Sequence, residues 1–182
     1  MSLHASAVST LDHWRPVRPG QESVRQALLA FLAARPDACL RSCAAGHITA
    51  SAVVLDHGGE HVLLTLHPRV GRWLQLGGHC EPTDQTLTAA ALREATEESG
   101  IAGLTIEPTP LHVEVHPITC SLGVPTRHLD VRFLVHAPAG AAPVRSAESV
   151  DLRWWPIASA ADGELRDLLA AALVRTAGSR AG

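Results

Sequence analysis

Three glutamates, Glu94, Glu97 and Glu98, stand within five positions of a 182-residue chain in which only 18% of the residues are charged. Positions i, i+3 and i+4 of an α-helix lie on one face, so the three carboxylates would project together if this segment is helical. Like charges at this spacing repel one another. Clustered carboxylate oxygens suit a hard divalent cation, whose shell water and a substrate phosphate can complete. A solvated charged face is the alternative that the charge pattern alone leaves open.

A glycine pair supports the cation site. Gly77 and Gly78 follow a predicted strand segment and precede the glutamates by about fifteen residues. Because glycine has no side chain, the backbone amides and carbonyls of these residues can approach the same place as the carboxylates. The combination favours a metal site over a charged face exposed only to water.

The elements that must position these residues follow from periodicity and breakers. Residues 1–20 are expected to be irregular, because Pro16 and Pro19 interrupt them. Helical spacing and helix formers predict helices over 21–35, 86–99 and 162–175, with Gly100 ending the second. Alternation and turn residues predict strands over 47–56, 61–68, 104–107, 111–119, 128–136 and 150–157, the first two joined by a hairpin turn at 57–60.

This order predicts an α/β (α+β) fold, a sandwich with helices on both faces of a mixed β-sheet. The length suits a single domain with an appendage. We expect a main domain over 46–182 and an N-terminal helical extension over 1–45. Whether the extension covers the sheet or builds a homodimer stays open at this point.

Residues 77–101, "GGHCEPTDQTLTAAALREATEESGI", resemble the Nudix box, G-x5-E-x7-R-E-U-x-E-E-x-G-U with U an aliphatic residue. The second half matches in register, from Arg93 to Ile101. The first half departs from the pattern, since counting back from Arg93 places the expected glutamate on Gln85. We interpret this as a one-residue insertion before the helix, with Asp84 in the place of the glutamate. The strand pattern from 47 to 157 fits the family fold more loosely.

The resemblance implies a Nudix-like α/β/α sandwich and a hydrolase that cleaves a diphosphate joined to another moiety, often a nucleoside, with Mg²⁺ or Mn²⁺. Carried over to this chain, the metal ligands are Glu94, Glu97, Glu98 and the Gly78 carbonyl. Glu97 and Glu98 also count as catalytic, because one glutamate can accept the proton of the attacking water. Arg93 is expected to orient a carboxylate and not to contact substrate.

Residues outside the box supply further candidates. Glu148, before the last strand, is the first candidate for an additional acid, as metal ligand or general base, and Glu114 is the second. Arg69 and Arg72 are candidates to clamp phosphates through bidentate hydrogen bonds. Trp73 either stacks on a base or belongs to the core.

The chain has eleven histidines, and their positions leave a second site open. His79 directly follows the glycine pair, while His47, His116 and His128 lie in predicted strands. Nudix-like prenyl-diphosphate isomerases use a histidine after such a turn, so His79 with Glu114 is a second metal or substrate site to consider. An isomerase of this type and a non-catalytic ligand sensor are the two alternatives to the hydrolase.

Bulk composition limits the partners. The net charge of −3 gives no reason to expect binding to nucleic acid polymers or to anionic membranes. The longest apolar run, residues 27–34, is far too short to span a bilayer. Four cysteines fit a reduced, cytoplasmic protein better than a disulfide scaffold. The expected partner is a small nucleotide-derived diphosphate.

Overall fold

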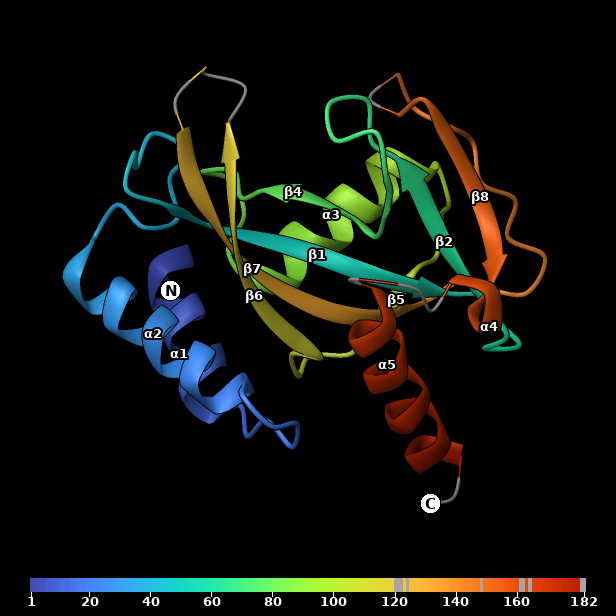
Figure 1. The fold of residues 1–182 in the computed structure, drawn as a ribbon, viewed down its shortest axis with the longest axis horizontal. Helices are drawn as coiled ribbons and strands as arrows, with labels where there is room; N and C mark the ends of the chain where they lie inside the picture. Colours follow the sequence, from blue (N-terminus) through green and yellow to red (C-terminus); the bar gives the residue numbers. More distant parts are fainter. Residues whose placement is uncertain (120–122, 124, 148, 161–162, 164, 181–182) are drawn as a thin grey trace.

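The computed structural model describes residues 1–119, 123, 125–147, 149–160, 163 and 165–180 (Figure 1). Its helices are α1 (Leu3–His13), α2 (Gln21–Ala34), α3 (Leu87–Ser99), α4 (Ile157–Ala160) and α5 (Leu165–Arg180). Its strands are β1 (His47–Leu55), β2 (His61–Leu66), β3 (Trp73–Leu74), β4 (Leu76–His79), β5 (Thr105–Ile106), β6 (His112–Thr119), β7 (Pro125–His136) and β8 (Asp151–Pro156). The strands form one mixed sheet, as the sequence predicts.

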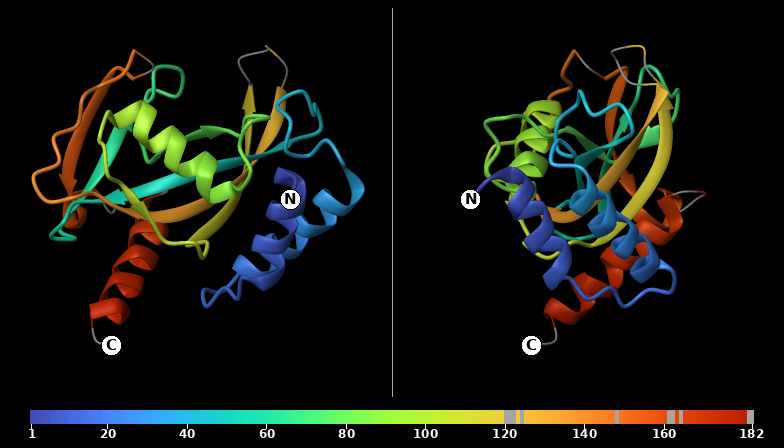
Figure 2. Two further views of the ribbon diagram at one scale, coloured as in Figure 1. Left: turned by 180° about the vertical axis from the view of Figure 1, so that it is seen from behind. Right: turned by 90° about the vertical axis from the view of Figure 1, so that its left-hand side faces the viewer.

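Strand β1 organises this sheet. It pairs in parallel with β7 along its whole length and antiparallel with β2 and β4. Strand β6 adds to the outer side of β7, and β8 adds to β2. A parallel pair needs a long crossover, and here the chain from β1 to β7 contains α3. The helix is thereby held across the sheet, which is visible from behind in the left panel of Figure 2.

Alternation along the strands gives the sheet two different faces. On one face, buried apolar side chains such as Ile48, Val131 and Phe133 pack against α1, α2 and α3. On the other face, α4 and α5 cover only one half, through Leu55, Leu134 and their neighbours. The result is the predicted sandwich with helices on both faces, and the uncovered half of the second face carries polar side chains.

The expectation that residues 1–20 are irregular is wrong, because Leu3–His13 form helix α1. The Ser2 side chain caps the helix by accepting a hydrogen bond from the Ala5 amide. Ala7 and Leu11 are completely buried in the core that includes α2 and the sheet. Burial of a leucine side chain contributes about 2 kcal/mol, so packing stabilises a helix whose serines, threonine and histidines have modest intrinsic propensity. The prolines follow the helix and end it.

The second N-terminal helix is confirmed close to its predicted bounds, and it holds an edge of the sheet. The Gln21 side chain donates from Nε2 to the Val113 carbonyl at 3.0 Å and accepts from the Val113 amide at 2.7 Å. Gln21 thus satisfies both backbone groups of Val113 in β6, as a neighbouring strand would. The N-terminal segment therefore covers the sheet of its own chain. No helix within the described ranges has both the length and the apolar character needed to cross a membrane.

Candidate active site

Helix α3 places the three glutamates as the sequence predicts. Thr86 caps its N-terminus, and Gly100, with φ of 64°, ends it in the left-handed conformation that glycine tolerates. Ala91 and Ala95 are completely buried against the sheet, and their small size allows a close approach. The remaining side of the helix carries Glu94, Glu97 and Glu98.

The glycine pair lies directly against these carboxylates. A Cβ atom on Gly78 would lie 2.8 Å from Oε2 of Glu94, and the Gly77 amide donates to Oε2 of Glu98 at 3.3 Å. On the opposite side of β4, a Cβ on Gly77 would lie 2.5 Å from Cα of Ser51, and the φ of 143° at Gly77 disfavours any side chain. Glycine is therefore required at Gly77 for β4 to pair with β1, and a side chain at Gly78 would displace the Glu94 carboxylate. We refer to Gly77, Gly78, Glu94, Glu97 and Glu98 as the carboxylate edge.

Arg93 is the cation of the carboxylate edge. Its Nη1 donates to Glu94 at 3.0 Å and to Glu97 at 3.1 Å, and its Nη2 donates to the His79 carbonyl at 2.9 Å. Its Nε and Nη2 also donate to the two carboxylate oxygens of Asp84, at 3.2 and 3.0 Å. Bidentate bonding of this kind fixes the guanidinium plane. Arg93 therefore contacts three carboxylates and joins the loop, β4 and α3, which agrees with a role in orienting carboxylates.

The bond to Asp84 agrees with the interpretation of the loop. Asp84 is buried, with 8% of its surface exposed, and its Oδ2 also accepts from the Glu81 amide at 2.7 Å. Gln85, on which the expected glutamate falls by simple counting, is exposed. With the one-residue insertion, Arg93 of the box still forms an ion pair with an acidic residue of the loop, and this residue is Asp84.

Electrostatics keep this pair ionised. Burial raises the pKa of Asp84, but hydrogen bonds from Arg93 and from the Glu81 amide outweigh burial and hold the pKa below its ordinary value of 3.8. Hydrogen bonding to Asp84 in turn raises the pKa of Arg93. Both groups are charged at neutral pH, so the anchor of the carboxylate edge is a permanent ion pair.

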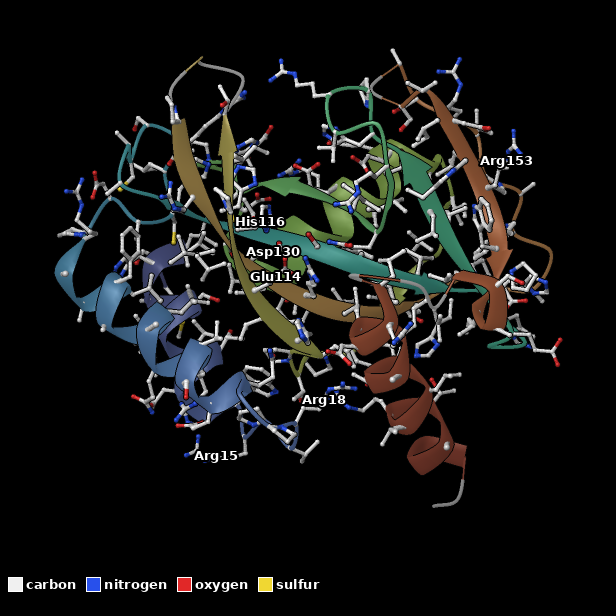
Figure 3. All side chains as sticks on the ribbon, in the orientation of Figure 1. Arg15, Arg18, Glu114, His116, Asp130 and Arg153 are labelled. Atoms are coloured by element: carbon white, nitrogen blue, oxygen red, sulfur yellow. The ribbon has the colours of Figure 1, made fainter. Side chains whose placement is uncertain are left out.

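A second polar region lies on the uncovered half of the sheet, on β1, β6 and β7. Asp130, 2% exposed, accepts hydrogen bonds from the hydroxyls of Thr49 and Ser51 and from Nε of Arg132. Arg132 also pairs with Glu114 at 2.6 Å. Burial raises the pKa of Asp130, but the charge of Arg132 and these hydrogen bonds lower it overall. Figure 3 shows Glu114, His116 and Asp130 together on this face.

Five histidines lie on the same face, which we call the histidine face: His47, His79, His112, His116 and His128. Their common orientation follows from register, since His47 pairs with His128 and His116 also pairs with His128, while His79 pairs with Thr49. The partnership of His79 with Glu114 stays a prediction. Glu114 pairs with Arg132, whereas the ring of His79 lies 5.0 Å from those of His47 and His128.

Four of these histidines, His47, His79, His112 and His128, are held in their neutral form. Burial, followed by the charges of neighbouring histidines, lowers the pKa of His79 to about 3 and that of His128 to about 4. Burial and the charge of Arg132 lower the pKa of His112 to about 4. Burial also lowers the pKa of His47. A neutral imidazole offers its lone pair to a metal ion, so these histidines can bind metals.

The other predicted site residues lie apart from the carboxylate edge along the chain. Arg69 and Arg72 are exposed in the turn between β2 and β3. Trp73 is partly buried, its ring 5.2 Å from that of Trp155 and 5.7 Å from the guanidinium carbon of Arg153. Its packing with Trp155 supports the core alternative. Glu148 lies outside the described residues.

Among the described residues, the group of three whose ligand atoms gather closely enough to hold a metal ion is His47, His79 and His128, and not the three glutamates. Glu94 and Glu97 instead share Arg93, and Glu98 faces Gly77. The assignment of the glutamates as metal ligands stays a prediction. Sequence reasoning named the histidines singly and missed their grouping, for which the only signal was their alternation within separate strands.

Comparison with known proteins places this geometry in context. The family model described as NUDIX domain matches residues 46–173. Comparison with curated proteins gives no match.

Solved structures resemble the fold. An Ap4A hydrolase of C. elegans in a binary complex is 24% identical with a TM-score of 0.56, covering 72% of this chain and 98% of that one. The MutT protein from Methanosarcina mazei Go1 is 20% identical with a TM-score of 0.56, covering 72% and 95%. The E. coli dihydroneopterin triphosphate pyrophosphohydrolase is 23% identical with a TM-score of 0.51, covering 63% and 83%. At these identities the likeness concerns the fold.

Proposed function

The chain belongs to the NUDIX domain family, and we propose that its carboxylate edge hydrolyses a phosphoanhydride bond in a small nucleotide-derived substrate, with Mg²⁺ or Mn²⁺ as the cofactor. A Nudix-type pyrophosphohydrolase is the enzyme class that the family match supports, as the sequence predicts. The observation that carries the proposal is the contact between Glu94 and Gly78, braced by Arg93 and Asp84. A surface helix that merely met water would need neither a glycine under its carboxylate nor an arginine anchored to a buried aspartate.

The residues of the carboxylate edge fit a hard divalent cation. Glu94, Glu97, Glu98 and the carbonyl of Gly78 would hold it, and all of these offer oxygen. The close approach of Glu94 to Gly78, which a Cβ would prevent, brings the helix and the strand together as such a ligand set requires. When bound, the cation would neutralise phosphate charge and lower the pKa of the attacking water.

The side chains of the protein would orient the carboxylates and accept the proton of the attacking water. Arg93 holds Glu94 and Glu97 through Nη1, so both carboxylates keep a fixed orientation before substrate arrives. Glu97 is exposed and can reach a water molecule from solvent, which suits it to accept the proton of that water. Glu98, held by the Gly77 amide, is the second candidate for this role.

The substrate class follows from the chemistry shared by the similar proteins. Ap4A and dihydroneopterin triphosphate, which appear in the names of two of the structural neighbours, both contain linked phosphates. Arg69 and Arg72, in the exposed turn before β3, would bind the phosphates, and Glu148 would supply the additional acid. For Trp73, whose ring already packs on Trp155, only its exposed edge remains for contact with a base.

A panel assay tests the proposal. The wild-type protein would be incubated with a dinucleoside tetraphosphate, nucleoside triphosphates, ADP-ribose and nucleotide sugars, each with Mg²⁺ or Mn²⁺, and release of phosphate or nucleotide would be measured. Glu97→Gln should lower kcat by about 10²- to 10⁴-fold, because it removes both a ligand and a proton acceptor. Glu60→Gln, at an exposed position in the β1–β2 turn, is the matched control and should leave kcat unchanged.

Two outcomes would contradict the proposal. Absence of cleavage across the panel with both cations would favour a non-catalytic ligand sensor. Loss of turnover in His79→Ala together with normal turnover in Glu97→Gln would favour isomerase-type chemistry on the histidine face.

A further inference from the structure

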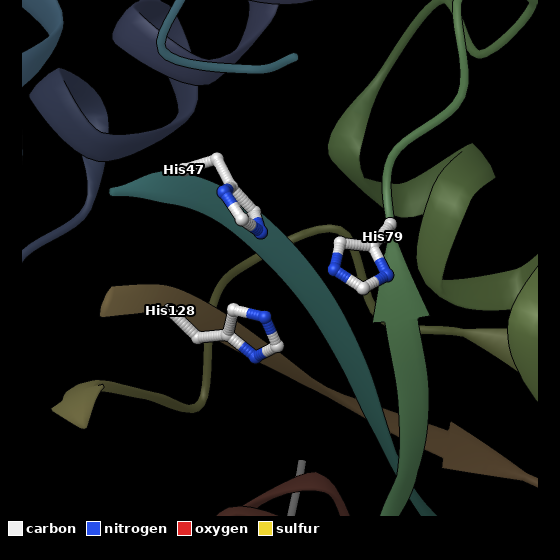
Figure 4. Close-up of side chains that lie close together, drawn as sticks. All are labelled: His47, His79 and His128. Atoms are coloured by element: carbon white, nitrogen blue, oxygen red, sulfur yellow. The ribbon is translucent and has the colours of Figure 1, made fainter. Parts of the chain in front are cut away.

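Three strands bring together three histidines that are distant in the sequence. His47 begins β1, His79 ends β4 and His128 lies in β7, and the three ring centroids are 5.0 Å from one another in every pair. One ligand atom from each residue lies within 4.8 Å of the others. Figure 4 shows a nitrogen of each ring directed toward the space between them. Sheet register, not local sequence, creates this triangle.

In His47, hydrogen bonding at Nδ1 leaves Nε2 available to bind a metal ion. His47 is 1% exposed, and its Nδ1 lies 3.4 Å from the Cys43 carbonyl, to which it can donate. A proton on Nδ1 leaves the lone pair on Nε2, and Nε2 of His47 is buried with no hydrogen-bond partner among the described residues. The Nε2 atom of His128 is likewise buried and without a partner. Burying a polar nitrogen unsatisfied costs about 1–3 kcal/mol, so two of them at one point require an explanation.

We propose that His47, His79 and His128 form a site for a transition-metal ion of the Zn²⁺ type, separate from the carboxylate edge. Three imidazoles are a ligand set that Zn²⁺ accepts and that Mg²⁺ does not favour. Nitrogens bound tetrahedrally at about 2.1 Å lie about 3.4 Å apart, so metal binding requires the ligand atoms, now within 4.8 Å of one another, to approach by at most about 1.4 Å. The backbone contact of His47 is the outer hydrogen bond that zinc-binding histidines commonly make. The fourth position is left to water or a small ligand.

The two sites lie on opposite faces of β4. Gly78 faces Glu94 on α3, while the alternation of the strand directs His79 to the other face, beside Thr49. Their connection is the His79 backbone, whose carbonyl accepts from Arg93 at 2.9 Å. An ion held by the three histidines would tie β1, β4 and β7 together next to the anchor of the carboxylate edge. The site does not depend on the hydrolase proposal, because it shares no ligand with it.

Zinc titration of the whole protein tests the site. Protein stripped with a chelator would be titrated with ZnCl₂ by calorimetry in saturating Mg²⁺, which occupies the oxygen ligands. Wild type should bind one Zn²⁺, and His128→Gln should weaken this binding by at least about 100-fold. The matched control is His57→Gln, at an exposed position in the β1–β2 turn, which should bind zinc as the wild type does.

A second measurement guards against a folding defect in the variant. In wild-type protein with ¹⁵N-labelled histidine, stoichiometric Zn²⁺ should shift the ring nitrogens of His47, His79 and His128 and leave those of His57 unchanged. Zinc binding that is equally tight in wild type and in folded His128→Gln would overturn the proposal. Binding that survives His128→Gln and disappears in Glu97→Gln would also overturn it, since the ion would then belong to the carboxylate edge.

Discussion

The carboxylate edge and the histidine face share strand β4, but they are assembled in different ways. All residues of the carboxylate edge come from positions 77–98, and Arg93 and Asp84 hold them from within the same segment. The histidines come from four strands between positions 47 and 128, and only β-pairing brings them together. The first region is rich in permanent charge, whereas in the second burial keeps most of the histidines neutral.

This difference determines how each region responds to change. A local charged site depends on one helix, one loop and their ion pairs, so its weak points are single residues. A site made by register depends on every strand being aligned, since a shift by one residue would turn the histidines toward the apolar core under α1 and α2. The contrast predicts distinct consequences for substitutions in the two regions.

The largest effect on the free energy of unfolding is expected from a substitution at Gly77, in the strand that both regions share. Gly77→Ala would place a Cβ 2.5 Å from the Ser51 backbone at a φ of 143°, so β4 must move away from β1. The expected loss is about 3 kcal/mol or more in the free energy of unfolding, measured by urea denaturation. Gly58→Ala, whose Cβ would meet nothing closer than 3.6 Å, is the control. Equal stability of both variants would mean that β4 is not constrained from both sides.

An intermediate effect on the free energy of unfolding is expected at the ion pair of Arg93 and Asp84. Asp84→Asn leaves Arg93 without its bidentate partner and should lower the free energy of unfolding by about 2 kcal/mol. The loss stays below that of a fully buried pair, because Arg93 is partly exposed. The neighbouring Gln85 is exposed. Its substitution by alanine should therefore cost less than about 0.5 kcal/mol.

Thermal or urea unfolding of the Asp84 and Gln85 variants decides which residue fills the acidic position of the box. The opposite order of stabilities would refute the assignment to Asp84.

Near pH 7 the smallest effect on stability is expected at His112, and this effect grows as the pH falls. The pKa of His112 falls from 6.5 in the unfolded chain to about 4 in the fold, so below about pH 6.5 the unfolded state binds the extra proton and stability falls until about pH 4. His112→Gln should flatten this slope by at most about 1.4 kcal/mol per pH unit. The low pKa of Asp84 instead contributes stability that is present above pH 3.8 and lost as pH falls through its folded pKa.

Urea unfolding at several pH values between about 7 and 4.5 measures this slope. His57→Gln serves as the control and should keep the wild-type slope. If His112→Gln keeps it as well, His112 is not buried in its neutral form.

Sequence reasoning predicted best what is encoded locally. The segment from Thr86 to Gly100 carries its own cap, helix formers and terminator, and α3 begins and ends within one residue of the prediction. The hairpin of β1 and β2 also follows from alternation and turn residues. The family match then confirmed the resemblance carried by the box.

What the sequence did not predict depends on contacts between distant segments. Helix α1 has weak propensity and is stabilised by burying Ala7 and Leu11, which no local pattern announces. The triangle of His47, His79 and His128 requires the registers of β1 with β4 and β7, and those registers are set by the apolar alternation of all three strands. Each histidine taken alone resembled an ordinary buried or exposed imidazole.

The bridge from Gln21 to Val113 has a consequence for any shorter version of the protein. The family match begins at residue 46. A fragment that starts there would lose the Gln21 side chain, which hydrogen-bonds to the Val113 backbone at the edge of β6. It would also lose the helices that cover Ile48 and Phe133. An exposed edge strand can pair with a strand of another molecule, so such a fragment should self-associate through β6. We therefore expect residues 1–45 to protect this edge of the sheet from pairing with other copies of the chain.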